Sequence, residues 1–142
     1  MRRKIKYYKG DYKYVLESAI EYETRITGRG CLLLFCSLNP TGRLVIQPGY
    51  AWDGPSGPTI DTPSFMRGSL IHDVLYQLLR MPTFEPDADE HDLIRHRADL
   101  LLREICLLDG MWKWRAAWVL RGVRAGGGPS AAVKKRRVYT AP

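Results

Sequence analysis

GSLIHDVLYQLLR, residues 68–80, has the apolar spacing of a buried helix and holds His72 and Asp73 side by side in its middle. Helical residues four positions apart lie on one face, so His72 and Tyr76 share a face, whereas Asp73 points about 100° around the axis. Gly68, one turn before His72, has no side chain and leaves the approach to the imidazole open. A neutral imidazole can take a proton from water when a carboxylate holds its other nitrogen. The stretch therefore predicts a helix that carries a candidate general base.

Helices are predicted throughout the second half of the chain. The first covers 63–81, because Thr62 can cap it and Pro63 suits the first helical position. A second covers about 87–110 and a third about 111–124, which contains three tryptophans and three arginines. Two interpretations of the third helix stay open. Its aromatic residues pack over the sheet with the arginines outside, or they stack on bases or anchor at a membrane interface.

The first half of the chain has the composition of β-strands. YKYVLESAIEYETRI, residues 12–26, is rich in β-formers with loose alternation in its second part. CLLLFCSL, residues 31–38, is a continuous apolar run typical of a strand covered on both faces. The turn signal at 39–42 and the apolar segment at 43–48 then complete a hairpin. The predicted fold class is α+β, an N-terminal antiparallel β-sheet packed against three C-terminal helices.

A single domain is predicted for residues 1–126, with strands at about 12–48 and helices at about 63–124. Between them, residues 49–62 hold several glycines and prolines together with apolar side chains. Such a segment is too punctuated for regular structure and too apolar for a linker, which indicates an ordered functional loop. The helical pattern is broken by GGGPS at 126–130, and residues 127–142 are predicted to form a flexible basic tail.

The carboxylate that could hold His72 is expected on another element, because Asp73 is adjacent to it in the chain. Asp99, in the segment RHRADLLL at 95–102, is the carboxylate nearest the apolar stripe of the second helix. If the first two helices pack antiparallel, Asp99 can reach His72. Asp73 is then available to bind a hard cation together with loop carbonyls, and calcium prefers such oxygen ligands.

One structural alternative and one further candidate site stand beside this catalytic interpretation. In the first, Asp73 buttresses the preceding loop and His72 bonds Asp99 only to stabilise the fold. In the second, the spacing i, i+4, i+7 places Asp92, His96 and Asp99 on one helical face, where they either bind a divalent metal or belong to a solvated surface.

The net charge of +7 is concentrated toward the two ends of the chain. The run KKRR near the C-terminus indicates a binding site for nucleic acid, an anionic membrane lipid or an acidic protein, or else a solubilising tail. Its residues are Lys134, Lys135, Arg136 and Arg137.

The three cysteines have no metal-site spacing and are predicted to be reduced. With neither a signal-peptide apolar region nor a transmembrane segment, the chain is expected to be made and kept in a cytoplasm.

The core from about residue 50 to 102 resembles the catalytic unit of small calcium-dependent secreted phospholipases of the A-two class. It resembles most the compact form embedded in parvovirus capsid proteins. The residues that carry the resemblance are DGPSGPTID at 53–61, HDVLY at 72–76 and RAD at 97–99. The loop here lacks the closely spaced glycines of the secreted enzymes, and prolines interrupt it.

This resemblance implies a role for each matching residue. His72 would be the general base for a water molecule, Asp99 its dyad partner and Tyr76 a support of their hydrogen bonds. Asp73 would be a calcium ligand. Backbone carbonyls of the loop would complete the calcium site, near Gly54, Ser56 and Gly57.

The order of these motifs, followed by a helix rich in Trp and Arg, is also similar to a family from bacteriophages and prophages known only as a domain of unknown function. The similarity covers roughly residues 12–126. It implies a phage-encoded protein associated with the particle, at the tail or baseplate or in assembly, with other phage structural proteins as partners. One alternative is an active calcium-dependent phospholipase-type hydrolase that breaches the host membrane. Another is a protein that acts in the host on nucleic acid or another acidic partner.

Overall fold

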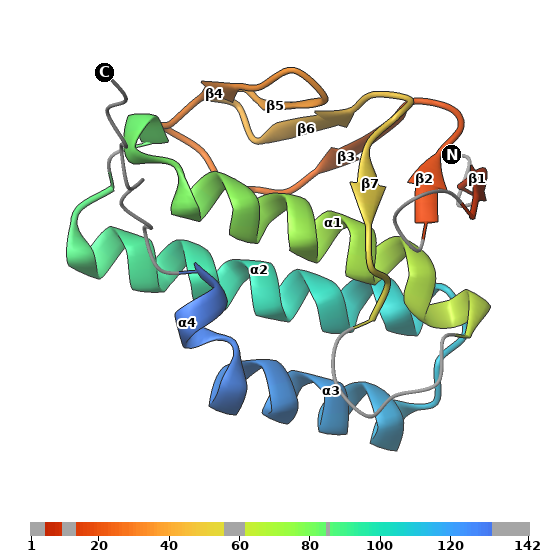
Figure 1. Ribbon diagram of the computed structural model, residues 1–142. Coiled ribbons are helices and arrows are strands. Elements are labelled where there is room, and N and C mark those ends of the chain that lie inside the picture. Colours follow the sequence, from red (N-terminus) through yellow and green to blue (C-terminus); the bar gives the residue numbers. More distant parts are fainter. Residues whose placement is uncertain (1–4, 10–13, 56–61, 85, 132–142) are drawn as a thin grey trace, which may run out of the picture.

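The computed structural model describes residues 5–9, 14–55, 62–84 and 86–131, and its strands precede its helices as predicted (Figure 1). The strands are short: β1 Tyr7–Tyr8, β2 Tyr14–Leu16, β3 Ile20–Glu23, β4 Cys31–Leu32, β5 Cys36–Leu38, β6 Arg43–Ile46 and β7 Ala51–Trp52. The helices are α1 Pro63–Arg80, α2 Ala88–Leu108, α3 Lys113–Gly126 and the short α4 Gly128–Ala131, with a 3-10 turn at Pro82–Phe84. The fold is therefore α+β.

The described strands form two small antiparallel sheets, in the orders β1-β2-β7 and β3-β6-β5-β4. The turn predicted at 39–42 joins β5 to β6, in which Ser37 pairs with Val45. Gly42 occupies the left-handed region with a φ of 95° and donates its N–H to the Asn39 carbonyl at 3.0 Å. Strand β7 pairs with β2 and so ties the start of the predicted loop to the first sheet.

The prediction of one covered strand at 31–38 is wrong. The segment turns back on itself, because the Leu33 N–H donates to the Cys36 carbonyl at 2.8 Å and β4 pairs with β5. A sheet that has a helix on one face buries only alternate side chains of each strand. Cys36 and Leu38 reach the core, whereas Leu34, in the turn, is 85% exposed. An apolar run alone could not distinguish these two arrangements.

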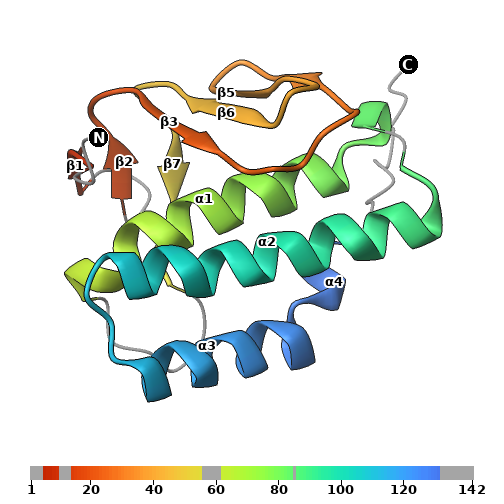
Figure 2. The same ribbon diagram turned by 180° about the vertical axis from the view of Figure 1, so that it is seen from behind.

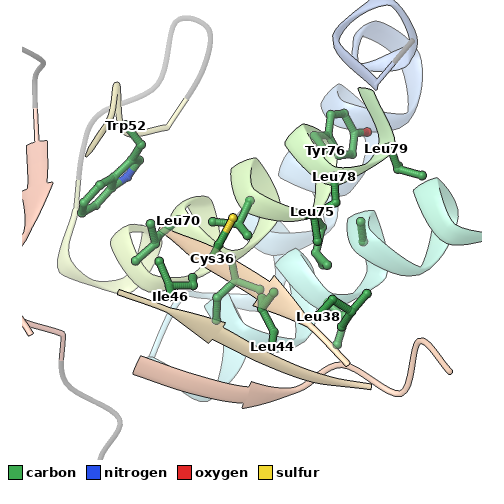
Figure 3. Close-up of a cluster of buried hydrophobic side chains, with 14 of the residues drawn as sticks. Cys36, Leu38, Leu44, Ile46, Trp52, Leu70, Leu75, Tyr76, Leu78 and Leu79 are labelled. Atoms are coloured by element: carbon green, nitrogen blue, oxygen red, sulfur yellow. The ribbon is translucent and has the colours of Figure 1, made fainter. Parts of the chain in front are cut away.

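Helix α1 lies between the sheets and α2, and α3 packs on α2 at the side away from the sheets (Figures 1 and 2). Apolar side chains of β5 and β6 gather beside those of α1, among them Leu44, Ile46 and Leu75 (Figure 3). Thr62 precedes α1 and Pro63 takes its first position, as predicted. The Thr62 hydroxyl makes no capping hydrogen bond to the helix and instead accepts a hydrogen bond from the Arg115 guanidinium at 2.9 Å. Asp87 caps α2 by accepting from the Glu90 N–H at 2.8 Å.

The tryptophans of α3 do not pack over the sheet, so that interpretation is wrong. Helix α3 buries Ala116 and Val119, which contact α2 and the start of α1 through a small cluster with Leu102 and Phe65. Within the described residues, α1 already packs against the inner side of the strands, and α3 packs on α2 instead. No helix within the described ranges has the length and apolar character needed to cross a membrane.

The register between α1 and α2 is fixed by a close approach at Gly68. A Cβ added there would lie 3.0 Å from the Cys106 Sγ and 3.3 Å from the Leu102 carbonyl oxygen. One residue earlier, the Arg67 guanidinium donates two hydrogen bonds of 2.9 Å to Asp109. Gly68 therefore allows the antiparallel helices to meet, and the expectation that it opens an approach to the imidazole is wrong.

Replacement of Gly68 by alanine tests this packing. Gly68→Ala should lower the free energy of unfolding by about 1 to 2 kcal/mol, since the crowding of a tight helix contact outweighs the better helix propensity of alanine. The matched control is Gly122→Ala in α3, where an added Cβ meets nothing within 4 Å. This change should raise the free energy of unfolding by about 0.5 to 1 kcal/mol. Both are measured by urea denaturation, and stabilisation by Gly68→Ala would contradict the close approach.

Candidate active site

The imidazole of His72 is bound directly to the carboxylate of Asp99. The His72 Nε2 lies 2.7 Å from the Asp99 Oδ1, and the Tyr76 hydroxyl donates to the same oxygen at 2.6 Å. His72 and Tyr76 come from successive turns of α1, and their rings lie 4.1 Å apart between centroids. Asp99 is fully buried and His72 is 7% exposed. The antiparallel helix pair thus brings together the three side chains that the sequence proposed as catalytic.

Arg124, which the sequence did not single out, completes the bonding of Asp99. Its Nη1 donates to the second carboxylate oxygen, Oδ2, at 3.0 Å. Arg95 holds this end of α3 by donating to the carbonyls of Val123 and Arg124 at 3.0 Å. It also donates to the Tyr76 hydroxyl at 3.3 Å. Arg124 is one of several arginines in α3, so only the tertiary placement of the helix distinguishes it.

Asp99 is held as a carboxylate. Burial alone would raise the pKa of Asp99, but the hydrogen bonds from His72, Tyr76 and Arg124 outweigh this and lower it below the ordinary value for aspartate. Burial, followed by the bond to Asp99, raises the pKa of the Tyr76 hydroxyl. Tyr76 therefore remains protonated and serves as a donor. A fully buried carboxylate that keeps its charge needs such donors, because it has lost its water.

The charge of Asp99 determines which nitrogen of His72 can act as a base. A carboxylate only accepts hydrogen bonds, so neutral His72 must carry its proton on Nε2 and its lone pair on Nδ1. The Nδ1 lies 3.9 Å from the Asp73 Oδ1, too far for a hydrogen bond, and makes none to another described residue. Burial would lower the pKa of His72, but the carboxylates of Asp73 and Asp99 together raise it.

A large pocket adjoins this network. It has a volume of about 1120 Å³ and is lined by His72, Asp73 and Tyr76 together with residues from the β4–β5 turn, β7 and α3. Its other walls are mainly apolar or aromatic, including Phe35, Trp52, Phe65, Leu102, Trp118 and Val119. Ligand pockets typically occupy about 300–1000 Å³, so this one can accept a large apolar group. The imidazole thus has one nitrogen bound to Asp99 while its ring borders an apolar pocket.

Of the residues proposed to bind calcium, Asp73 and Gly54 fall within the described ranges, whereas Ser56 and Gly57 lie outside them. Asp73 is partly exposed and lines the pocket with Asp53. Gly54 is buried and adopts a φ of 79°, so the chain turns sharply where it passes the pocket. Among the described residues, no three His, Cys, Asp or Glu side chains gather as a metal-binding group.

The alternative metal site on α2 is wrong. Asp99 turns inward to His72, while Asp92 and His96 are exposed. Residues spaced i, i+4 and i+7 share a face only approximately, and here that face divides between the core and solvent. Lys134, Lys135, Arg136 and Arg137, proposed to bind an acidic partner, lie outside the described residues.

Comparison with known proteins finds no matching family model, no matching curated protein and no matching solved structure. The similarities to the phage family and to the phospholipases therefore rest on the sequence motifs alone and stay predictions.

The pKa of His72 should depend on the charge of Asp99. Asp99→Asn removes a negative charge that stabilises the imidazolium, while the burial that disfavours the imidazolium remains. The pKa of His72 should therefore fall, and NMR titration of the ring protons measures it. The resonances of His91 and His96 provide internal references in the same spectra. An unchanged or raised pKa of His72 in Asp99→Asn would show that the carboxylate does not act on the imidazole as described.

Proposed function

We propose that this chain is a hydrolase in which the Nδ1 of His72 is the general base. The observation that carries the proposal is the asymmetry of the imidazole. Its Nε2 is bound to a fully buried carboxylate, its Nδ1 has no hydrogen bond to the described residues, and His72 lines the pocket. A histidine that served only to stabilise the fold would gain from having both nitrogens bonded.

The chemistry assigned to the dyad is hydrolysis of an ester. The Nδ1 takes a proton from a water molecule in the pocket as the water oxygen attacks the acyl carbon. Asp99 stabilises the imidazolium that forms and does not itself take the proton. The imidazolium then returns the proton to the oxygen of the departing alcohol as the acyl–oxygen bond breaks. The products are a carboxylic acid and an alcohol.

The lining of the pocket favours a lipid ester as substrate. Aromatic and aliphatic side chains from β7, the β4–β5 turn, α1 and α3 surround a volume large enough for part of an acyl chain. The thiol of Cys36, which also lines the pocket, is an unsuitable nucleophile because burial raises its pKa to about 11. His72 is therefore the favoured catalytic group.

Calcium belongs to this proposal as a ligand of Asp73. The Asp73 carboxylate lies 3.9 Å from the His72 Nδ1, beyond hydrogen-bond distance, and lines the pocket beside the dyad, which suits a hard cation. Backbone oxygens of the loop, near Gly54, Ser56 and Gly57, would supply the remaining ligands. When bound, calcium would polarise the ester carbonyl and stabilise the negative charge that develops on its oxygen.

Association with a phage particle, with other phage structural proteins as partners, stays a prediction from the sequence. It is compatible with a hydrolase that acts on a host membrane, since a particle could carry such an activity. Location in the virion or in the host cytoplasm and binding of nucleic acid are likewise predictions from the sequence.

Release of fatty acid from vesicles tests the proposed function. The wild-type chain, with calcium present, should hydrolyse vesicles of equal parts phosphatidylcholine and phosphatidylglycerol. His72→Gln should reduce the rate by about 100- to 10,000-fold, because the glutamine amide can still donate to Asp99 but cannot accept the proton from water. The matched control is His96→Gln, on the exposed surface of α2, which should keep the wild-type rate.

Calcium chelation should abolish fatty acid release by the wild-type chain. Equal release by the wild type and His72→Gln would exclude His72 as the base. No release by the folded wild type in the presence of calcium would show that the buried network only stabilises the fold.

A further inference from the structure

Three tryptophans at the start of α3 and along its outer side are exposed. Trp112, Trp114 and Trp118 are 70%, 66% and 57% exposed, and the rings of the first two lie 6.0 Å apart between centroids. Exposed Lys113 and Arg121 accompany them. We call these five residues the aromatic face. Side chains of this size are seldom left in water without a binding role, particularly when they are grouped.

The charge beside the aromatic face is positive. Helix α3 contains lysine and arginine but no aspartate or glutamate. Two of its arginines have structural roles, since Arg115 donates to Thr62 and Arg124 donates to Asp99. Lys113 and Arg121 have exposed side chains next to the tryptophans. The face therefore combines large amphipathic rings with cations, which suits an anionic partner.

The aromatic face continues into the pocket beside His72. Trp118 is exposed and also lines that pocket. From a different element, the β4–β5 turn contributes Leu34, which is 85% exposed, and the partly exposed Phe35 to the lining. Exposed apolar side chains therefore border the pocket from both α3 and the β4–β5 turn. A partner that covers them would also cover the pocket.

We infer that the aromatic face, together with the β4–β5 turn, binds the surface of an anionic lipid bilayer. Indole rings favour the boundary between headgroups and acyl chains, and lysine and arginine are attracted to anionic headgroups. Aliphatic Leu34 favours lipid over nucleic acid, because it cannot stack on bases as an aromatic ring does. The contact is interfacial and needs no spanning helix. The further statement that this contact brings a lipid ester to His72 rests on the proposed function.

Vesicle binding by the full chain carrying His72→Gln tests this inference without hydrolysis. Sedimentation with vesicles of equal parts phosphatidylglycerol and phosphatidylcholine should pellet the protein, and vesicles of phosphatidylcholine alone should bind it more weakly. Tryptophan emission should shift to the blue, because the exposed rings enter the interface while buried Trp52 is unaffected. Adding Trp118→Ser or Arg121→Glu should weaken partitioning on the order of ten-fold.

Matched controls come from α2. Leu93→Ser removes an apolar side chain that is 69% exposed, Arg103→Glu reverses an exposed charge, and neither residue lines the pocket. Both should bind as the parent does. Equal binding by Trp118→Ser, Arg121→Glu and the parent would overturn the inference, because the basic ends of the chain would then account for binding. Capture of DNA without vesicle binding would also overturn it.

Hydrolysis and binding are separable in these experiments. If the protein binds vesicles through the aromatic face but the wild type releases no fatty acid, the inference of a bilayer-binding surface is supported and the proposed function is contradicted. If the wild type releases fatty acid but the variants of the aromatic face bind vesicles normally, the proposed function is supported and the inference of a bilayer-binding surface is contradicted.

Discussion

The buried carboxylate of Asp99 constrains the arrangement of all three long helices. It is carried by α2 and accepts hydrogen bonds from His72 and Tyr76 of α1 and from Arg124 of α3. An ionised carboxylate removed from water without such donors would cost several kcal/mol. The antiparallel packing of α1 on α2, with its close approach at Gly68, places His72 and Tyr76 opposite this carboxylate. Arg95 secures the end of α3 that supplies Arg124.

This constraint fixes the Nε2 side of the His72 imidazole, while Nδ1 makes no hydrogen bond to a described residue and lies 3.9 Å from the Asp73 carboxylate. Asp99 orients the ring and holds the proton on Nε2, which leaves the lone pair on Nδ1, and His72 lines a pocket with mainly apolar walls. The neighbouring carboxylates raise the pKa of His72. The neutral imidazole, which is the form that can act as a base, is therefore populated only at higher pH. A cation bound at Asp73 would offset one of these charges and favour the neutral form. Stability and the proposed chemistry therefore depend on the same hydrogen bonds.

Sequence patterns predicted those parts of the fold that depend on local spacing. The apolar stripes and the Thr-Pro start gave α1, and spacing along two antiparallel helices brought His72 to Asp99. Sequence patterns failed to predict burial where the burial of one element depended on where another element packs. The apolar run at 31–38 formed a tight hairpin, and the tryptophans of α3 remained exposed because α1 occupies the inner sheet face. Arg124 could not be distinguished from its neighbours before α3 was placed against Asp99.

The state of the His72 ring tests the central claim most directly. Nitrogen-15 NMR, at a pH above the pKa of His72, reports which ring nitrogen carries the proton. We predict a proton on Nε2, bound to Asp99, and a bare Nδ1 that can accept a proton from water. A neutral ring protonated on Nδ1 would contradict this claim, because Asp99 could not then hold His72 as a base that faces the pocket.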